Sequence, residues 1–231
     1  MRNNRYSMTS TRGASFERGW SAGMSARVFD TQVLPIFAFG LLMTGMAAYL
    51  GWNIPRGLLF PIVIVELILI FTASRWQRIE NKGANVGLFL LLTALSGLSL
   101  VPLLNWAVVI SGPQLIAQAF GVTALTFGGL VGYSLTTKKD FSGLGGFLIV
   151  ALIGIIIASI VNIFIGGTVF SLAISVISVG IFSAFVLYDM SMIKQHYSDQ
   201  DYIFAAIALY LDFILLFQHI LNIMGIMSSR D

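Results

Sequence analysis

Two aspartates stand inside the last two long apolar runs of the chain, and they constrain its fold more than any other feature. Asp189 lies within IFSAFVLYDMSMI and Asp212 within ALYLDFILLF. An ionised carboxylate in hydrocarbon costs several kcal/mol unless it is paired, hydrated or protonated. Two such groups on neighbouring helices therefore predict a shared site.

The composition predicts that these runs cross a membrane. Of the 231 residues, 57% are hydrophobic and 10% are charged, and the mean hydropathy is +0.89. Soluble domains do not reach these values. Helical runs of about 20 residues match a hydrocarbon core of roughly 30 Å. The sequence therefore predicts an all-α membrane protein, a seven-helix bundle with spans at 33–52, 57–76, 84–105, 113–135, 143–165, 168–193 and 203–226.

The domain organisation is simple, with a polar segment at 1–30 followed by a single transmembrane domain at 31–231. The polar segment is rich in Arg, Ser and Thr, which is typical of a flexible cytoplasmic tail. An organelle transit peptide has the same composition, and that alternative stays open. All but two of the 13 lysines and arginines, Arg56 and Arg230, fall on the N-terminal side of the membrane. The positive-inside rule then predicts a cytoplasmic N-terminus and, after seven spans, an external C-terminus.

Small residues recur within the spans and suggest where helices approach closely. Glycines spaced for small-xxx-small packing are Gly128 and Gly132, and a second group is Gly143, Gly145 and Gly146. Such residues let helix backbones come together in membranes. The GLGG segment lacks the Lys-Ser/Thr of a phosphate loop, so helix packing is the expected role.

The two aspartates are expected to lie at different depths along their spans. Asp189 is near the end of the sixth span and Asp212 is nearer the middle of the seventh. A helix tilt, or a late helix start after Asp201, would bring the two carboxyl groups level. Carboxyl groups in contact cannot readily both ionise, so the pair should hold one proton and respond to pH.

Other polar residues in the spans are candidates for a path or a relay. At 100° per residue, the face of the sixth span that carries Asp189 also carries Ser171, Ser175 and Ser178. Serines of this kind bond neighbouring helices or line a hydrated path. His219, seven residues after Asp212, is either a packed histidine or a proton relay. Glu66 in the second span is expected to be paired or protonated in the bundle.

Enzyme motifs are mostly absent from the sequence. It has two histidines, no cysteine, no HExxH and no GxSxG elbow with a partner base. Intramembrane aspartyl proteases have two buried aspartates, but their second motif is GxGD, where this chain has LYLDF. The prediction is a protein that is not an enzyme and has no cofactor. Nucleic acid is not an expected partner, because the basic residues lie in tails and loops.

Several segments together resemble the transmembrane BAX inhibitor motif family, and its bacterial branch in particular. The segments are LYDMSMIK, ALYLDFILLFQHIL, VELILIF, TTKKDFSGLGGF and IVNIF. The similarity covers nearly the whole chain after about residue 28. It implies a bundle whose seventh helix is central and is wrapped by the other six.

The resemblance also implies a function. In that family, the aspartates that correspond to Asp189 and Asp212 sense pH and gate a calcium leak. An arginine late in the second helix bonds the first aspartate in the closed state, and Arg78 and Arg75 are both candidates for this latch. The resulting hypothesis is a pH-sensitive calcium (cation) leak channel of a bacterial inner (plasma) membrane. Its partners are the bilayer, protons and Ca²⁺, which the pair would bind transiently as the permeant ion.

Two other functions stay open at this point. One is a membrane-embedded regulator of another membrane protein, such as a quality-control protease or a cell-death factor. The other is proton-coupled transport. For a regulator, the aspartates would act only on fold or conformation.

Overall fold

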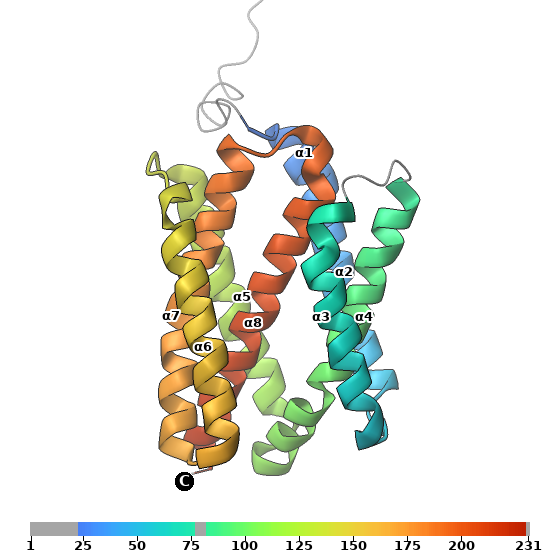
Figure 1. Ribbon diagram of the computed structural model, residues 1–231, viewed down its shortest axis with the longest axis vertical. Coiled ribbons are helices and arrows are strands. Elements are labelled where there is room, and N and C mark those ends of the chain that lie inside the picture. The colour runs from blue at the N-terminus through green and yellow to red at the C-terminus, as the bar shows by residue number, and fades with distance from the viewer. Residues whose placement is uncertain (1–22, 77–81, 230–231) are drawn as a thin grey trace, which may run out of the picture.

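The computed structural model describes residues 23–76 and 82–229, and within these ranges it is helical throughout apart from short connections (Figure 1). Within these two ranges, seven helical segments are long and apolar enough to cross a membrane, as the sequence predicts. In chain order the elements are α1 (Ala26–Val28), η2 (Phe29–Val33), α2 (Leu34–Leu50), α3 (Arg56–Trp76), α4 (Lys82–Ser111), α5 (Pro113–Thr136), η3 (Ser142–Leu144), α6 (Gly145–Ile165), α7 (Thr168–Gln195), η4 (Asp199–Asp201) and α8 (Tyr202–Ser228).

The first span begins earlier than predicted, because α1, η2 and α2 form one continuous rod. Ser25 starts it by accepting a hydrogen bond from the Val28 N–H (3.4 Å), so the last residues of the predicted tail are helical. The wider π turn of η2 ends two residues before Pro35, which has no N–H to give to a regular α-helical ladder. The third span is also longer than predicted: α4 continues through Pro102 to Ser111.

Helix α8 is the most buried span. In its most apolar window 67% of the residues are buried, against at most 39% for any other span. It packs against α2, α4, α5 and α7, while α3 packs on α4 and α6 packs on α7 at the outside. Figure 1 shows that α8 runs obliquely across the bundle rather than parallel to α7. Asp212 and the α8 residues next to it in the sequence therefore lie inside the helical bundle.

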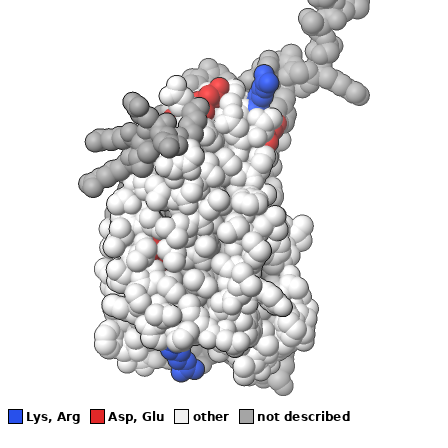
Figure 2. Space-filling view, turned by 90° about the vertical axis from the view of Figure 1, so that its right-hand side faces the viewer, with Lys and Arg blue, Asp and Glu red and all other residues white. Residues whose placement is uncertain are grey.

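The outer helices carry the lipid-facing surface. Large apolar side chains are exposed along α3 and α6, among them Phe60 (76% exposed), Phe71 (78%) and Phe164 (82%). The face in Figure 2 is almost entirely white between charged groups at its two ends, with one small red patch near mid-height. This distribution fits helices that contact hydrocarbon along their length.

Of the glycines predicted to pack closely, only Gly145 does so, while Gly143 and Gly146 meet nothing within 4 Å. A Cβ at Gly128 or Gly132 would meet nothing within 4 Å, so the small-xxx-small prediction is wrong for this pair. In the second group Gly145 does meet a neighbour, the Tyr188 ring at 3.0 Å. A Cβ at Gly97 would collide with the Thr44 carbonyl oxygen, which places the α2 and α4 backbones in near contact. Spacing alone does not reveal which glycine faces lipid and which faces a helix.

Candidate functional site

The structure brings Asp189 of α7 and Asp212 of α8 together. Their side chains are close enough for a hydrogen bond between the two carboxyl groups. Two ionised carboxylates have no donor between them, so this bond requires that one group holds a proton. The predicted difference in depth is overcome by the oblique course of α8 (Figure 1) and by its start at Tyr202, after the short η4 turn.

Asp212 lies in an apolar and closely packed part of the core. Its side chain is 4% exposed, and Met190, Leu209 and Leu216 nearby on α7 and α8 are fully buried. The Oδ2 atom of Asp212 accepts no hydrogen bond from any hydroxyl or N–H group of the described residues. A buried oxygen of this kind marks a place for water, an ion or a transferred proton.

Two of the α7 serines, Ser171 and Ser175, line a polar pocket between α6, α7 and α8. Asn222 donates hydrogen bonds to Ser171 Oγ (3.1 Å) and to Ser175 Oγ (2.7 Å). His219 Nδ1 lies 3.5 Å from Ser175 Oγ, and its ring stacks on Phe182. The pocket measures about 200 Å³ and is also lined by Ser159, Asn162 and Gln218. His219 is thus both packed and hydrogen-bonded, and it stands in the wall of a polar cavity.

Two further oxygens near this pocket have no partner among the described residues. They are Asn162 Oδ1 at the pocket and Ser178 Oγ, which lies one turn further along α7 toward Asp189. Asp212 Oδ2, deeper in the bundle, is a third buried oxygen without a partner among the described residues, and the apolar residues Phe182 and Val186 lie between Ser178 and Asp189 on α7. Buried polar atoms of this kind in proteins commonly bond to water.

The bundle is tightly packed at the end nearer to Asp189. Met24 and Ile193 are both fully buried, and the Met24 N–H donates to the Ile193 carbonyl (3.1 Å). Asp199 accepts hydrogen bonds from the Ser25 N–H (2.6 Å) and hydroxyl (3.1 Å). Burial, with the nearby charge of Asp189, raises the pKa of Tyr197, so this phenol stays neutral. Met24 and Ser25 therefore pack against the end of the bundle at which α7 and α8 are joined.

Glu66 belongs to a second polar cluster on the other side of α8. Ser96 donates to Glu66 Oε1 (2.5 Å), and the Tyr210 hydroxyl lies 2.6 Å from Thr44 Oγ1 and within hydrogen-bonding range of Ser96. Thr44 also donates to the Thr93 carbonyl (2.9 Å). The structure thus pairs Glu66 within the bundle and keeps it apart from the two aspartates.

The arginine latch falls outside the part of the chain that the structure describes. Arg78 lies in the segment 77–81, and at Arg75 only the backbone, near the end of α3, is described. Within the described residues, no three His, Asp or Glu side chains come together as a metal site would require. Transient binding of Ca²⁺ by Asp189 and Asp212 stays a prediction.

Sequence reasoning missed the residues that complete both polar clusters. The pocket needs Asn222 and Asn162, and the Glu66 cluster needs Ser96, Tyr210 and Thr44. A signal was present for Asn222, which follows His219 by three residues and so lies on the same helical face. No comparable signal existed for Thr44 and Ser96, because hydroxyl residues are common in membrane helices.

The fold and the site define a polytopic helical membrane protein with a carboxyl pair at its core. The family model described as "Inhibitor of apoptosis-promoting Bax1" matches residues 26–229, and the chain belongs to this family. An uncharacterized protein of Campylobacter jejuni is 36% identical over 97% of this chain and 99% of its own. Uncharacterized membrane proteins of Vibrio cholerae (43% identical, 65% of this chain, 68% of the relative) and Streptococcus pyogenes (40%, 70% and 72%) are also similar.

Proposed function

We propose that the protein is a pH-sensitive leak pathway for Ca²⁺ and related cations, gated by Asp189 and Asp212. The observation that carries this proposal is the contact between the two carboxyl groups inside the membrane-spanning bundle. A buried acid pair that serves only stability is hard to explain, since apolar residues of similar volume stabilise a core at least as well. A pair that exchanges a proton can switch a conformation.

The switch follows from the charge of the pair. With one proton present, the carboxyls share a hydrogen bond and hold α7 against α8. When that proton leaves, two negative charges about 4 Å apart repel by about 4 kcal/mol at an effective dielectric constant of about 20. That energy is enough to shift a two-state equilibrium by roughly a thousandfold. The oxygens that separate are also suitable ligands for a passing Ca²⁺ ion.

The polar pocket supplies the approach from the opposite end of the bundle. Ser171, Ser175 and Asn222 line it, and the unpartnered Ser178 Oγ lies between it and the aspartates. Cations that enter there would meet oxygen atoms before they reach Asp212. The end near Met24 and Ile193 is packed, so this conformation corresponds to the closed state of the proposed pathway.

The proposal includes a location and an orientation. The membrane is that of a bacterial cell, in keeping with the bacterial relatives, and the inner membrane is the proposed site. The clustering of Lys and Arg on the N-terminal side places the N-terminus in the cytoplasm. The closed end of the bundle then faces the cytoplasm, and the polar pocket faces outward.

The test is Ca²⁺ flux into liposomes that contain only the purified protein, measured against pH. Wild type should conduct above empty vesicles and should change with pH. Asp212→Asn cannot form two opposed carboxylates, so its flux should lose the pH dependence. Asp140→Asn is the matched control, because Asp140 is an aspartate in an exposed loop. Wild-type pH dependence retained by Asp212→Asn would exclude the aspartate mechanism.

The same vesicles separate this function from the alternative. Wild-type protein that conducts no more than empty vesicles at any pH would exclude the leak pathway. The remaining hypothesis would then be a regulator that acts on another membrane protein. In that case the aspartates would set only the packing of α7 against α8.

A further inference from the structure

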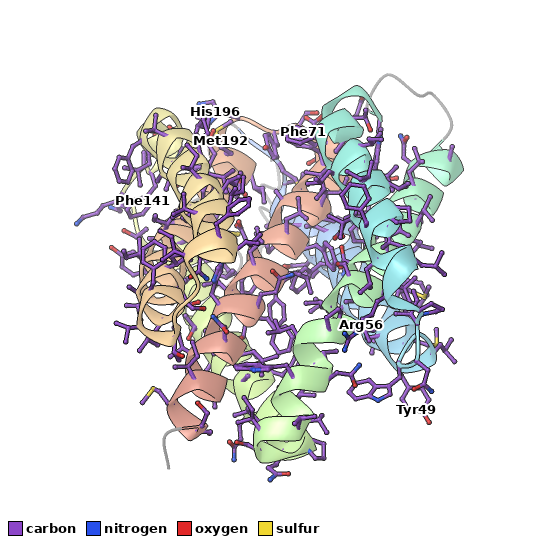
Figure 3. All side chains as sticks on the ribbon, turned by 60° about the horizontal axis from the view of Figure 1, so that its bottom comes forward. Tyr49, Arg56, Phe71, Phe141, Met192 and His196 are labelled. Atoms are coloured by element: carbon purple, nitrogen blue, oxygen red, sulfur yellow. The ribbon has the colours of Figure 1, made fainter. Side chains whose placement is uncertain are left out.

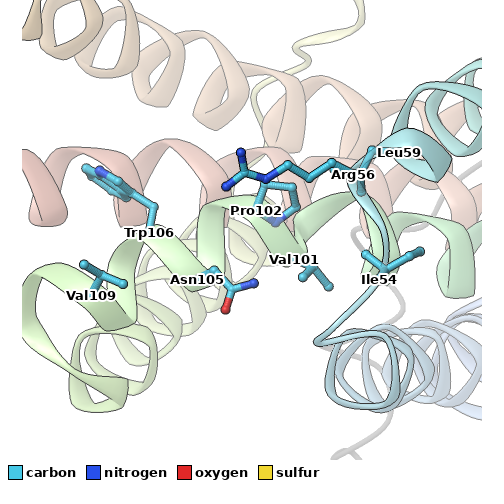
Figure 4. Close-up of a pocket in the computed structure, with 8 residues that line it drawn as sticks. All are labelled: Ile54, Arg56, Leu59, Val101, Pro102, Asn105, Trp106 and Val109. Carbon is cyan, nitrogen blue, oxygen red and sulfur yellow. The ribbon is translucent and has the colours of Figure 1, made fainter.

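A cavity of about 500 Å³ lies where α3 begins and α4 nears its end, remote from the aspartate pair (Figure 4). Arg56 from the first turn of α3 and Asn105 and Trp106 from α4 contribute its polar and aromatic lining. The remaining walls are aliphatic. In Figure 4 the Arg56 side chain extends across Pro102 toward Trp106. The cavity thus combines one cation with apolar surface.

The charge at this cavity is not neutralised by a described neighbour. Figure 3 places Arg56 with Tyr49 at the end of the bundle opposite His196 and Met192. Among the residues that the structure describes, Arg56 is the one charged side chain at that end. Helix α3 starts at Arg56, so the positive end of its dipole adds to the guanidinium. The cavity therefore attracts an anion.

Hydrogen-bond donors for an oxyanion are present as well. A guanidinium binds phosphate oxygens in a two-pronged geometry. The Asn105 side-chain amide uses one N–H on the Trp52 carbonyl (3.4 Å), and an amide group has a second N–H to offer. Trp106 has the ring type that prefers the boundary between headgroups and hydrocarbon.

The surroundings favour a lipid over a small soluble anion. Val109, in the cavity wall, is 86% exposed, and Leu58 and Phe60 on the first turns of α3 are 51% and 76% exposed. These side chains face the lipid phase, so the cavity opens toward the acyl region as well as toward the headgroups. We propose that this cavity binds an anionic phospholipid, with its phosphate at Arg56 and Asn105 and its acyl chains along the exposed aliphatic surface of α3 and α4.

Native mass spectrometry of the purified full-length protein, with added dioleoylphosphatidylglycerol or dioleoylphosphatidylcholine, tests the proposal. Wild type should retain severalfold more phosphatidylglycerol than phosphatidylcholine. Arg56→Gln should bind the two lipids equally, while Arg56→Lys should keep part of the preference. Arg27→Gln is the matched control, because it removes an exposed arginine from the opposite end of the bundle. It should behave as wild type.

Two further measurements make the result decisive. Each variant is first checked for wild-type helicity and thermal stability, and Asn105→Leu replaces Arg56→Gln if that variant does not fold. A phosphatidylglycerol preference that survives in the folded variant overturns the proposal. Inorganic phosphate is then added in large excess. Lipid binding that persists supports a lipid site, and displacement by phosphate assigns the cavity to small anions and overturns the lipid proposal.

Discussion

Helix α8 carries two polar side chains only two residues apart, and the protein treats them in opposite ways. Tyr210 and Asp212 point about 200° apart around the helix. The Tyr210 hydroxyl meets Thr44 and Ser96, and Ser96 in turn bonds Glu66. Asp212 meets Asp189 and keeps an oxygen that no donor of the described residues satisfies. The hydrogen bonds around Tyr210 are complete, whereas those around Asp212 are not.

This difference indicates that the Tyr210 network stabilises the bundle and that the Asp212 site can change its conformation. A fully satisfied polar network in a low-dielectric core fixes one arrangement of the helices around it. An incomplete network is stable only while water or a proton completes it, so its state depends on conditions. The Tyr210 side therefore acts as the fixed frame of α2, α3 and α4, and the Asp212 side is where we expect movement. Substitutions at either site test this interpretation.

The largest expected effect is at Gly97, within the frame. In Gly97→Ala the new methyl group would collide with the Thr44 backbone carbonyl, and it would lie 2.9 Å from the Ala47 Cβ. Overpacking of this kind costs roughly 1–3 kcal/mol or more, because backbone cannot rotate away as a side chain does. Gly180→Ala on α7 meets nothing within 4 Å and should be neutral or slightly stabilising, since alanine favours helix by up to about 1 kcal/mol.

Thermal unfolding of both variants in the same detergent measures this contrast. A large drop in Tm for Gly97→Ala beside an unchanged Gly180→Ala would agree with a tight frame and a looser α7. Equal Tm values would show that α2 and α4 separate easily, and the distinction between the two sides would be lost.

The next effect compares the two polar residues directly. Tyr210→Phe removes a hydroxyl whose two partners, Thr44 and Ser96, are buried, so it should lower the free energy of unfolding by about 1–2 kcal/mol. It should leave the pH dependence of Ca²⁺ flux in place. Asp212→Asn should show the reverse, with a smaller loss of stability and no pH dependence, because it removes a costly buried acid. Denaturant titration and flux on the same preparations give both readouts, and an Asp212→Asn that unfolds more easily than Tyr210→Phe contradicts the comparison.

How much of this was predictable from the sequence differs between the two sides. The spans and the aspartates were predictable, because hydrocarbon tolerates so few charges that Asp189 and Asp212 stand out in apolar runs. Their contact needed the oblique course of α8, which no local pattern encodes. Of the polar cluster around Tyr210, only Glu66 was predictable as a paired group, without its partners. Thr44, Ser96 and Tyr210 come from three helices, and each residue alone is ordinary in a membrane span.

The sequence also did not show which residues of each span face lipid and which face another helix. Gly128 and Gly132 have the spacing of a packing motif, yet they face open space, while Gly97 lies at a helix contact with no second glycine four residues away. In membranes the lipid-facing and helix-facing sides of a span are equally apolar, so hydropathy does not separate them. For the same reason the cavity at Arg56 could not be predicted, because it forms only when α3 and α4 pack together.

A smaller effect, a roughly tenfold difference in rate, is expected for the chemical modification of introduced cysteines. The chain has no cysteine, so single cysteines can be introduced without further changes. Ser175→Cys lies in the polar pocket, and Thr93→Cys replaces a hydroxyl of equal burial within the frame (2% and 0% exposed). If water fills the pocket, a charged, membrane-impermeant thiosulfonate should modify Ser175→Cys at least about tenfold faster, since each 1.4 kcal/mol of opening free energy slows the other site tenfold. Equal rates would mean that the pocket is dry or closed.

The smallest effect is expected at Asp140, a carboxyl group that is both exposed and satisfied. The Ser142 N–H donates to Asp140 Oδ1 (2.8 Å), and this bond lowers the pKa of Asp140 below its ordinary value. A lowered pKa in the folded state means that the bond contributes stability above the unfolded-state value of about 3.9 and loses it as pH falls through the lower, folded-state pKa. Asp140 therefore stays ionised at every pH near neutrality. Asp140→Asn should leave the pH profile of Ca²⁺ flux unchanged; a shifted profile would move the sensor from the buried pair to the loop between α5 and α6.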